Sequence, residues 1–267
     1  MNSNNQTVYL DMGVLSRLRG NSALNQHTLI FSDALLLDLK NSSMPELELD
    51  YLKKQNALYV RKNASGLETV QVDPFDAFEQ VCDLETNAMA PLLSILNGGG
   101  PDTGFERVLE SVFEELGVNI SVPVESSNAG INRIIGQGID KLKHKLGSKF
   151  NLQEVIADLP EVGQQALSSI VPRDSAPTFD QLKFAAMTLS LMGIQSKNIQ
   201  SRTAEKSLKV ARHDHIDSEH IAYGLHFNVF ISTDDITSVK AGTLRDHWNI
   251  DTEVWYYDVK IGQLKKV

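Results

Sequence analysis

The stretch His213–Asp235, HDHIDSEHIAYGLHFNVFISTDD, carries most of our interpretation of the fold. It opens with acids and histidines, continues as a short amphipathic helix from about Asp217, and becomes an apolar strand at 229–232. Two adjacent aspartates, Asp234 and Asp235, follow that strand. Open α/β sheets place their sites at the carboxyl ends of strands, so the stretch predicts a site beside these aspartates.

A second strand of the same kind lies near the start of the chain, where residues 7–11 read TVYLD. Gly13 follows, and then a helix with apolar residues on one side, which is the order of a βα unit. Two carboxylates at strand ends, Asp11 and Asp234, with a third at Asp217 on the helix, suggest a metal site.

The run HTLIF at 27–31 predicts another short strand, and Ser32 or Asp33 could cap the helix that follows it. That helix contains ALLLDLK, in which Asp38 stands between leucines. A carboxylate in such a run is partly desolvated, which is costly unless it is paired, hydrogen-bonded or bound to a metal. Asp38 is therefore the candidate for the fourth acid, with Asp33 as the alternative.

The remaining pattern divides the chain into strand-rich ends and a helical middle. Near the first end we expect a helix at 45–55, a hairpin of strands at 58–60 and 67–72, and a helix at 74–84. Residues 105–211 are almost entirely helical in pattern, and the last part predicts a helix to about 247 and a strand at 252–257. We expect an α/β core formed by 1–95 and 200–267, with 96–199 as a helical insertion or cap.

Composition limits the classes of function. The formal net charge of −9 argues against non-specific nucleic-acid binding over the whole surface, although it permits a local basic groove. The single cysteine, Cys82, excludes an intrachain disulfide and argues against a cysteine-based zinc site. No signal peptide and no apolar stretch of bilayer-spanning length is read, so we expect no membrane partner and a cytoplasmic protein.

The acids at the two strand ends suggest a particular chemistry. Several carboxylates that converge on one point repel each other unless a cation lies among them. Mg²⁺ and Mn²⁺ prefer oxygen ligands, and Mg²⁺ keeps several of its waters. One such ion lowers the pKa of an attacking water, and a second can stabilise the leaving oxygen. The predicted metal ligands and catalytic residues are Asp11, Asp38, Asp217 and Asp234.

Four pieces of this chain together resemble the PIN-like nuclease family. They are V-Y-L-D ending at Asp11, F-S-D-A-L-L-L-D-L around Asp38, D-S-E-H-I-A-Y-G from Asp217, and F-I-S-T-D ending at Asp234. The resemblance covers the two ends of the chain and not its middle. It implies a three-layer αβα core with a mainly parallel sheet, acids at the carboxyl edge that hold Mg²⁺ or Mn²⁺, and cleavage of single-stranded or structured RNA.

One position departs from the family pattern. The second acidic position is commonly Glu in the family, and the residue that matches it here is Asp38. The side chain of aspartate is shorter than that of glutamate, so Asp38 matches the family pattern less closely than Asp11 and Asp234 do.

Other residues near these acids have two interpretations each. Ser232 and Thr233 could orient substrate or a water molecule, or could be ordinary strand-end hydroxyls. His220 lies one helical turn after Asp217 and could orient the same groups, although a structural hydrogen bond is the commoner role. Asp11 and Asp217 could simply cap helices.

Of the adjacent aspartates only one is expected to bind a metal, because neighbouring side chains of a strand point to opposite faces. We assign Asp234 to the site and Asp235 to the cap of the next helix, with the reverse as the alternative. His213 and His215 lack the spacing of a helical zinc motif. The basic residues Lys206, Lys209 and Arg212 are candidates for RNA contacts, although such residues usually form a solvated helix face.

The sequence therefore predicts a metal-dependent endoribonuclease whose substrate is RNA. Toxin, phage-defence effector and RNA-processing enzyme are all open as biological roles, as are a homo-oligomer and a regulatory protein partner. A catalytically silent relative that binds RNA or a protein is the first alternative. A helical interaction protein, in which the middle segment is the functional part, is the second.

Overall fold

The computed structural model of the chain describes residues 5–19, 24–63, 66–82, 150–157, 164, 168, 171–172, 175–191 and 204–267, without the side chains of 191 and 204–212. Its strands are β1 (Thr7–Leu10), β2 (Thr28–Ser32), β3 (Leu58–Asn63), β4 (Gly66–Val70), β5 (Val229–Ser232), β6 (Glu253–Asp258) and β7 (Gln263–Lys266). Its helices are α1 (Met12–Leu18), α2 (Asp33–Leu39), α3 (Pro45–Lys54), α8 (Leu152–Ala157), α10 (Phe179–Leu191), α11 (Ala204–Gly224) and α12 (Asp235–Trp248). Residues 74–82 are also helical.

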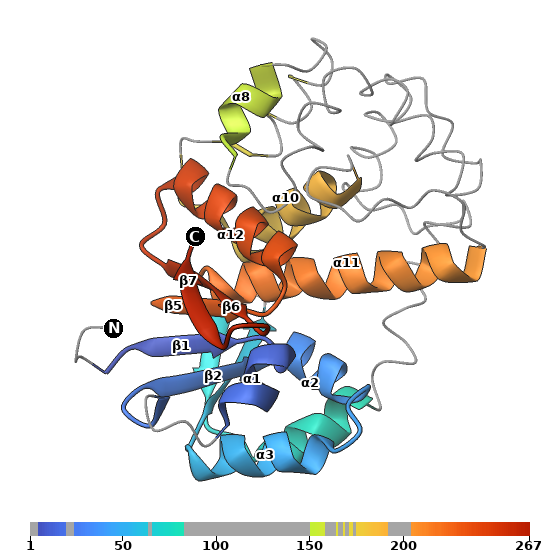
Figure 1. Cartoon of the computed structure of the whole chain (residues 1–267), viewed down its shortest axis with the longest axis vertical. Coiled ribbons are helices and arrows are strands. Elements are labelled where there is room, and N and C mark those ends of the chain that lie inside the picture. The colour runs from blue at the N-terminus through green and yellow to red at the C-terminus, as the bar shows by residue number, and fades with distance from the viewer. Residues whose placement is uncertain are drawn as a thin grey trace.

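The strands form one sheet in the order β4-β3-β2-β1-β5-β6-β7. The five inner strands are parallel, whereas β4 and β7 pair antiparallel at the two edges. The central pair joins the two ends of the chain, with Val8 opposite Val229 and Leu10 opposite Ile231. Figure 1 shows this junction as blue β1 beside orange β5. All five parallel strands therefore end at one edge of the sheet, as a mixed α/β fold of this kind predicts.

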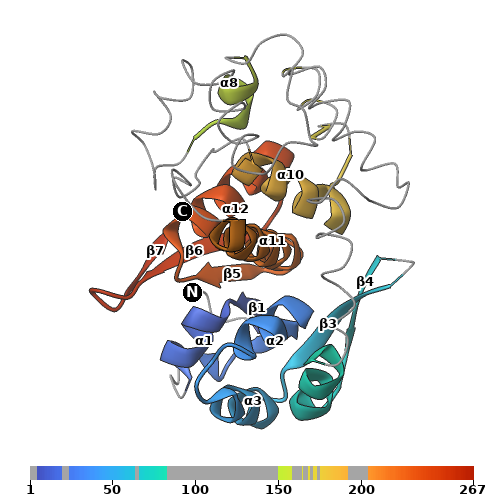
Figure 2. The same cartoon turned by 90° about the vertical axis from the view of Figure 1, so that its right-hand side faces the viewer.

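Each face of the sheet carries a hydrophobic cluster, because side chains alternate along a strand. Val8 and Leu10 of β1 belong to the cluster that also contains apolar residues of α1, α2 and α3. Tyr9 belongs to the opposite cluster, with residues of α10, α11 and α12. The two views agree that these two sets of helices lie on opposite sides of the sheet (Figure 1, Figure 2). Fully burying one such apolar side chain stabilises the fold by about 1.5–3 kcal/mol.

Three of the helices are capped by a polar residue that ends a strand or follows it within two residues. Asp11 caps α1 by accepting a hydrogen bond from the Val14 amide, and Ser32 caps α2 in the same way. Asp234 caps α12. A short polar side chain satisfies one of the free amides of a first helical turn. The expectation that Ser32 or Asp33 caps its helix is confirmed for Ser32.

The predicted α/β class, the strands that end near Asp11 and Asp234, and the hairpin of β3 and β4 are confirmed. Two expectations are wrong. The helix expected to start near Asp217 is the C-terminal part of the continuous helix α11, so Asp217 does not cap a helix. The strand expected to be the last, β6, is followed by another strand, β7. All residues of β7 are exposed, so its sequence lacks the alternation of apolar and polar residues that marks a half-buried strand.

The expected helical insertion at 96–199 is described only in part, since residues 96–149 lie outside the described residues. In the part that is described, Leu182 and Leu189 of α10 share a cluster with Tyr9 and Phe230 of the sheet. Helix α10 therefore helps to cover one face of the sheet. The boundary at residue 200 stays a prediction.

Candidate active site

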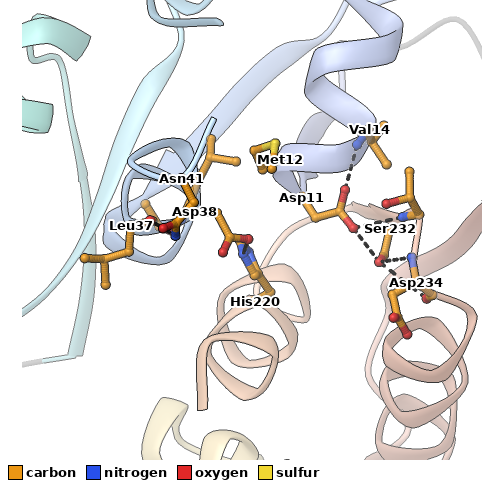
Figure 3. A network of polar contacts seen from close by, with 12 residues as sticks. Asp11, Met12, Val14, Leu37, Asp38, Asn41, His220, Ser232 and Asp234 are labelled. Carbon is orange, nitrogen blue, oxygen red and sulfur yellow. Dashed lines mark hydrogen bonds and ion pairs between the residues drawn. The ribbon is translucent and has the colours of Figure 1, made fainter. Parts of the chain in front are cut away.

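Asp11 lies at the carboxyl end of β1 and connects it to the end of β5 (Figure 3). Its Oδ1 accepts a hydrogen bond of 2.7 Å from the Val14 amide. Its Oδ2 accepts one of 2.5 Å from the Ser232 hydroxyl and one of 2.8 Å from the Thr233 amide. Burial raises the pKa of Asp11, and these hydrogen bonds oppose that rise. Asp11 is thus a buried carboxylate that holds two loops of the edge together.

The first turn of α1 approaches the loop after β5 very closely. A Cβ built on Gly13 would lie 2.2 Å from Thr233 Oγ1 and 3.2 Å from Thr233 Cβ. A side chain at this position would have to displace Thr233, so the strand–acid–glycine order of the sequence has a packing reason. The amide of Thr233 is also a donor to Asp11, so Gly13 indirectly protects that hydrogen bond.

We expect Gly13→Ala to destabilise the protein by about 1–3 kcal/mol, the usual cost of an added methyl in a filled space. Urea unfolding measures this. The double variant Gly13→Ala/Thr233→Ala should recover most of the loss, because it removes Oγ1 and the methyl group, while Thr233→Ala alone serves as the control. If Gly13→Ala unfolded at the wild-type midpoint, the close approach would have no energetic weight.

Asp234 follows β5 and begins α12. Its Oδ1 accepts a hydrogen bond of 2.9 Å from the Thr237 amide, and its own amide donates to Ser232 Oγ over 3.0 Å. The expectation that Asp235 provides this cap is therefore wrong. Asp235 is exposed in the first turn of α12, where its carboxylate contacts the next amide, that of Ile236. The carboxylate of Asp234 is half-buried.

Asp217 is a carboxyl in unfavourable surroundings. It is half-buried on α11, and burial together with repulsion by Asp234 raises its pKa from 3.8 to about 7. The charges of His220 and Lys240 act in the opposite direction. Desolvation and a neighbouring like charge both disfavour the ionised form of an acid. Asp217 and Asp234 therefore form a pair of acids that are close enough to repel each other.

His220 lies among the candidate acids and is almost fully buried, with 1% of its surface exposed. Its Nε2 lies 3.0 Å from Asp38 Oδ2, and its Nδ1 lies 2.8 Å from the hydroxyl of Tyr9. Burial alone lowers the pKa of His220, but the hydrogen bond to Asp38 and the charges of Asp38, Asp11 and Asp217 raise it overall. The structure thus brings three of the four candidate acids into the electrostatic surroundings of one imidazole.

Asp38 itself is half-buried and turned toward His220 (Figure 3). The alternative fourth acid, Asp33, accepts a hydrogen bond from the Tyr59 hydroxyl instead. Burial raises the pKa of Asp33, and the charge of Glu219 adds to the rise while the Tyr59 bond opposes it. Both acids of α2 therefore have partners of their own.

The remaining candidates are placed less fully. Ser232 is buried and bonds to Asp11, and Thr233 is half-buried beside Gly13. Lys206, Lys209 and Arg212 are in α11, but their side chains lie outside the described residues. His213 is exposed, and His215 lies 3.5 Å from Glu219, one turn further along the helix.

The donor set can be compared with the needs of a divalent cation. Within the described ranges, no group of three or more His, Cys, Asp or Glu side chains is arranged to hold a metal ion. A pair of carboxylates that repel each other, Asp217 and Asp234, remains, and a cation would relieve this repulsion. Two carboxylates suit Mg²⁺, which usually keeps several waters and needs one or two protein carboxylates. The residues therefore fit a largely hydrated ion.

Sequence reasoning missed two residues of this region. Tyr9 is fully buried in β1 and bonds to both Ser32 and His220. A tyrosine inside an apolar strand needs a partner for its hydroxyl, and that was the available signal. Lys240 is also buried, and its Nζ lies 2.5 Å from the hydroxyl of Ser190. A lysine between apolar positions of α12 could have been noticed in the same way.

Comparisons with known proteins identify no relative. The chain matches no model of a known protein family, no curated protein and no solved structure. Among the helices that the structure describes, none combines the length and apolarity required to cross a membrane. The resemblance to PIN-like nucleases therefore rests on the four motifs of the sequence.

Proposed function

We propose that this chain is a PIN-like endoribonuclease that depends on Mg²⁺ or Mn²⁺. The observation that carries the proposal is the pair Asp217 and Asp234 at the carboxyl edge of a parallel sheet. Burial and mutual repulsion raise the pKa of Asp217 to about 7, so the ionised pair is unfavourable without a cation. A site that is strained in this way is a candidate for function.

The finer description of the fold belongs to the same proposal. Helices on both faces of a mainly parallel sheet support a PIN-like three-layer core. Residues 96–199 would then be an insertion or cap that contributes to substrate choice. Lys206, Lys209 and Arg212 remain the proposed RNA contacts.

The residues of the edge would divide the work. Asp217 and Asp234 would hold the cation directly and Asp38 would hold it through one of its waters, while Asp11 would fix the Ser232–Thr233 loop through its hydrogen bonds. Thr233, which is half-buried, would border the phosphate and its attacking water, whereas the buried Ser232 would support the loop from below. When bound, a divalent cation supplies an activated water and stabilises charge on the phosphate. The chain then needs no nucleophilic side chain.

A specific observation favours one other function. Asp11 and Asp234 both cap helices, and Asp38 is hydrogen-bonded to His220. Three of the four acids thus have structural tasks that would preserve them without catalysis. The second candidate is therefore a catalytically silent PIN-like module that binds RNA or a protein.

One experiment separates these functions. Thermal melting of the metal-free protein at pH 7.5 with increasing Mn²⁺ should show a rise that saturates, because a ligand of the folded state alone stabilises it. Cleavage of a fluorescent single-stranded RNA should require Mg²⁺ or Mn²⁺ and stop with a chelator. A rise in melting temperature without cleavage would support the silent module. If the protein showed neither a melting shift nor cleavage, the metal proposal would fail altogether.

A further inference from the structure

A continuous chain of hydrogen bonds runs beneath the acidic site, and the proposed function has not used it. It begins at the Leu35 amide, which donates to Ser32 Oγ over 3.4 Å. The next contacts are 2.7 Å from Ser32 Oγ to the Tyr9 hydroxyl and 2.8 Å from that hydroxyl to His220 Nδ1. The last is 3.0 Å from His220 Nε2 to Asp38 Oδ2. This series of hydrogen bonds therefore starts and ends on α2 and passes through β2, β1 and α11.

The chain is sealed from water except at its end. Ser32 and Tyr9 have no exposed surface and His220 has 1%, whereas the Asp38 side chain is 24% exposed. A buried hydroxyl that lacks an acceptor for its proton costs about 1–3 kcal/mol. The direction in which the protons point is therefore constrained by the chain itself.

Only one orientation of the protons gives every donor and acceptor in this series of hydrogen bonds a partner. An ionised Asp38 can only accept, so Nε2 must carry a proton. Since Ser32 Oγ already accepts from the Leu35 amide, its own proton is available for the oxygen of Tyr9. The proton of Tyr9 then points at Nδ1, which accepts it. In the reverse direction Ser32 would receive two donors and its proton would have no acceptor within this chain.

We propose that His220 is the positioning residue of the site, and that Ser32 and Tyr9 hold its neutral ring as the Nε2–H tautomer, so that it fixes the Asp38 carboxylate. The benefit of a fixed Asp38 for cation binding rests on the proposed function. The tautomer does not. A short aspartate can occupy few positions at the end of α2, and a rigid donor selects one of them.

The first test reads the tautomer without metal or RNA. In protein labelled with ¹⁵N-histidine at pH 8.5, two-bond ¹H–¹⁵N spectra should show His220 with a protonated Nε2 and a bare Nδ1. The His220→Gln variant assigns the signals by their loss. Tyr9→Phe keeps the ring and removes the hydroxyl, so the Nδ1 resonance should move, whereas Tyr223→Phe, in a ring stacked 6.2 Å from Tyr9, should leave it in place. A His220 ring protonated at Nδ1, alone or together with Nε2, would overturn the proposal.

The second test asks whether Asp38 depends on the donor. His220→Gln can still offer an amide N–H to Asp38, whereas His220→Leu cannot. Loss of an outer partner of a metal ligand typically weakens metal binding by about 10-fold to 100-fold. Calorimetric titration with Mn²⁺ should show such a loss in His220→Leu and at most about a threefold loss in His220→Gln. Equal losses in the two variants would reduce His220 to a packing role.

The two proposals fail in different ways. Wild-type protein that binds no Mn²⁺ would end the metal proposal and leave the tautomer spectrum as the test of the hydrogen-bond chain. Wild-type protein that binds Mn²⁺ but shows the wrong tautomer would end the role of His220 and leave the metal site intact.

Discussion

Asp234→Asn is expected to abolish the rise in melting temperature with Mn²⁺ and to reduce RNA cleavage by about a hundredfold or more. The substitution removes one of the two charges that would hold the cation. It keeps a side-chain oxygen for the Thr237 amide, and asparagine caps helices as well as aspartate does. The variant should therefore remain folded. Melting with and without Mn²⁺ and a single-turnover cleavage assay measure both effects.

Asp235→Asn is the matched control, because it is the next residue and makes the same chemical change. Asp235 is exposed and does not cap α12, so its replacement should leave the Mn²⁺ response and cleavage close to wild type. The opposite pattern, with loss in Asp235→Asn alone, would show that the wrong aspartate is assigned to the site.

Asp217→Asn is expected to stabilise the metal-free protein at high pH and to leave its stability at pH 4 nearly unchanged. The folded protein holds the Asp217 proton up to a pKa of about 7, whereas the unfolded chain loses it near 3.8. Wild-type stability should therefore fall between pH 4 and 7, and the loss should be complete above pH 7. The asparagine of the variant cannot ionise, so the variant should lack this contribution to the loss of stability with rising pH.

The size of this effect follows from the shift. One pKa unit corresponds to about 1.4 kcal/mol, and solvent screening at a half-buried carboxyl reduces the total, so we expect a difference of about 2 kcal/mol at pH 8. Urea unfolding at pH 4 and pH 8 measures it, with Asp251→Asn at an exposed position as control. At pH 8, saturating Mg²⁺ should raise the stability of the wild-type protein but not that of Asp217→Asn. Parallel pH curves for wild type and Asp217→Asn would sink the assignment of Asp217 as a strained acid.

Local patterns predicted much of the sheet and its edge. The apolar runs that end at Asp11 and Asp234 gave strands of the right type and position, because burial on both faces leaves a near-continuous apolar run. Strand β7 escaped because all four of its residues are exposed and only its pairing with β6 defines it. The polar run near Asp217 made the sequence pattern of α11 look interrupted. The helix is nevertheless continuous, because helices in proteins are stabilised mainly by packing against the rest of the fold, which a local pattern does not record.

The site was predictable as a set of residues but not as a geometry. Aspartates at strand ends indicate an acidic edge, yet Tyr9 and His220 are 211 residues apart, and their hydrogen bond leaves no sign in either local pattern. Which of Asp234 and Asp235 caps α12 depends on where the first turn of the helix begins, to within one residue. Sequence periodicity does not fix helix boundaries that closely.

The pairing of β1 with β5 also determines when the protein can assemble. The Asp11–Ser232 hydrogen bond closes a separation of 221 residues, and closing an unstructured loop of that length costs roughly 5 kcal/mol of chain entropy. Folding around so distant a contact is slow, and during synthesis the first strand must wait for its partner. A growing chain that ends before residue 229 lacks β5 and Asp234 altogether. For the proposed nuclease, this order keeps Asp11 and Asp234 apart until synthesis has passed β5.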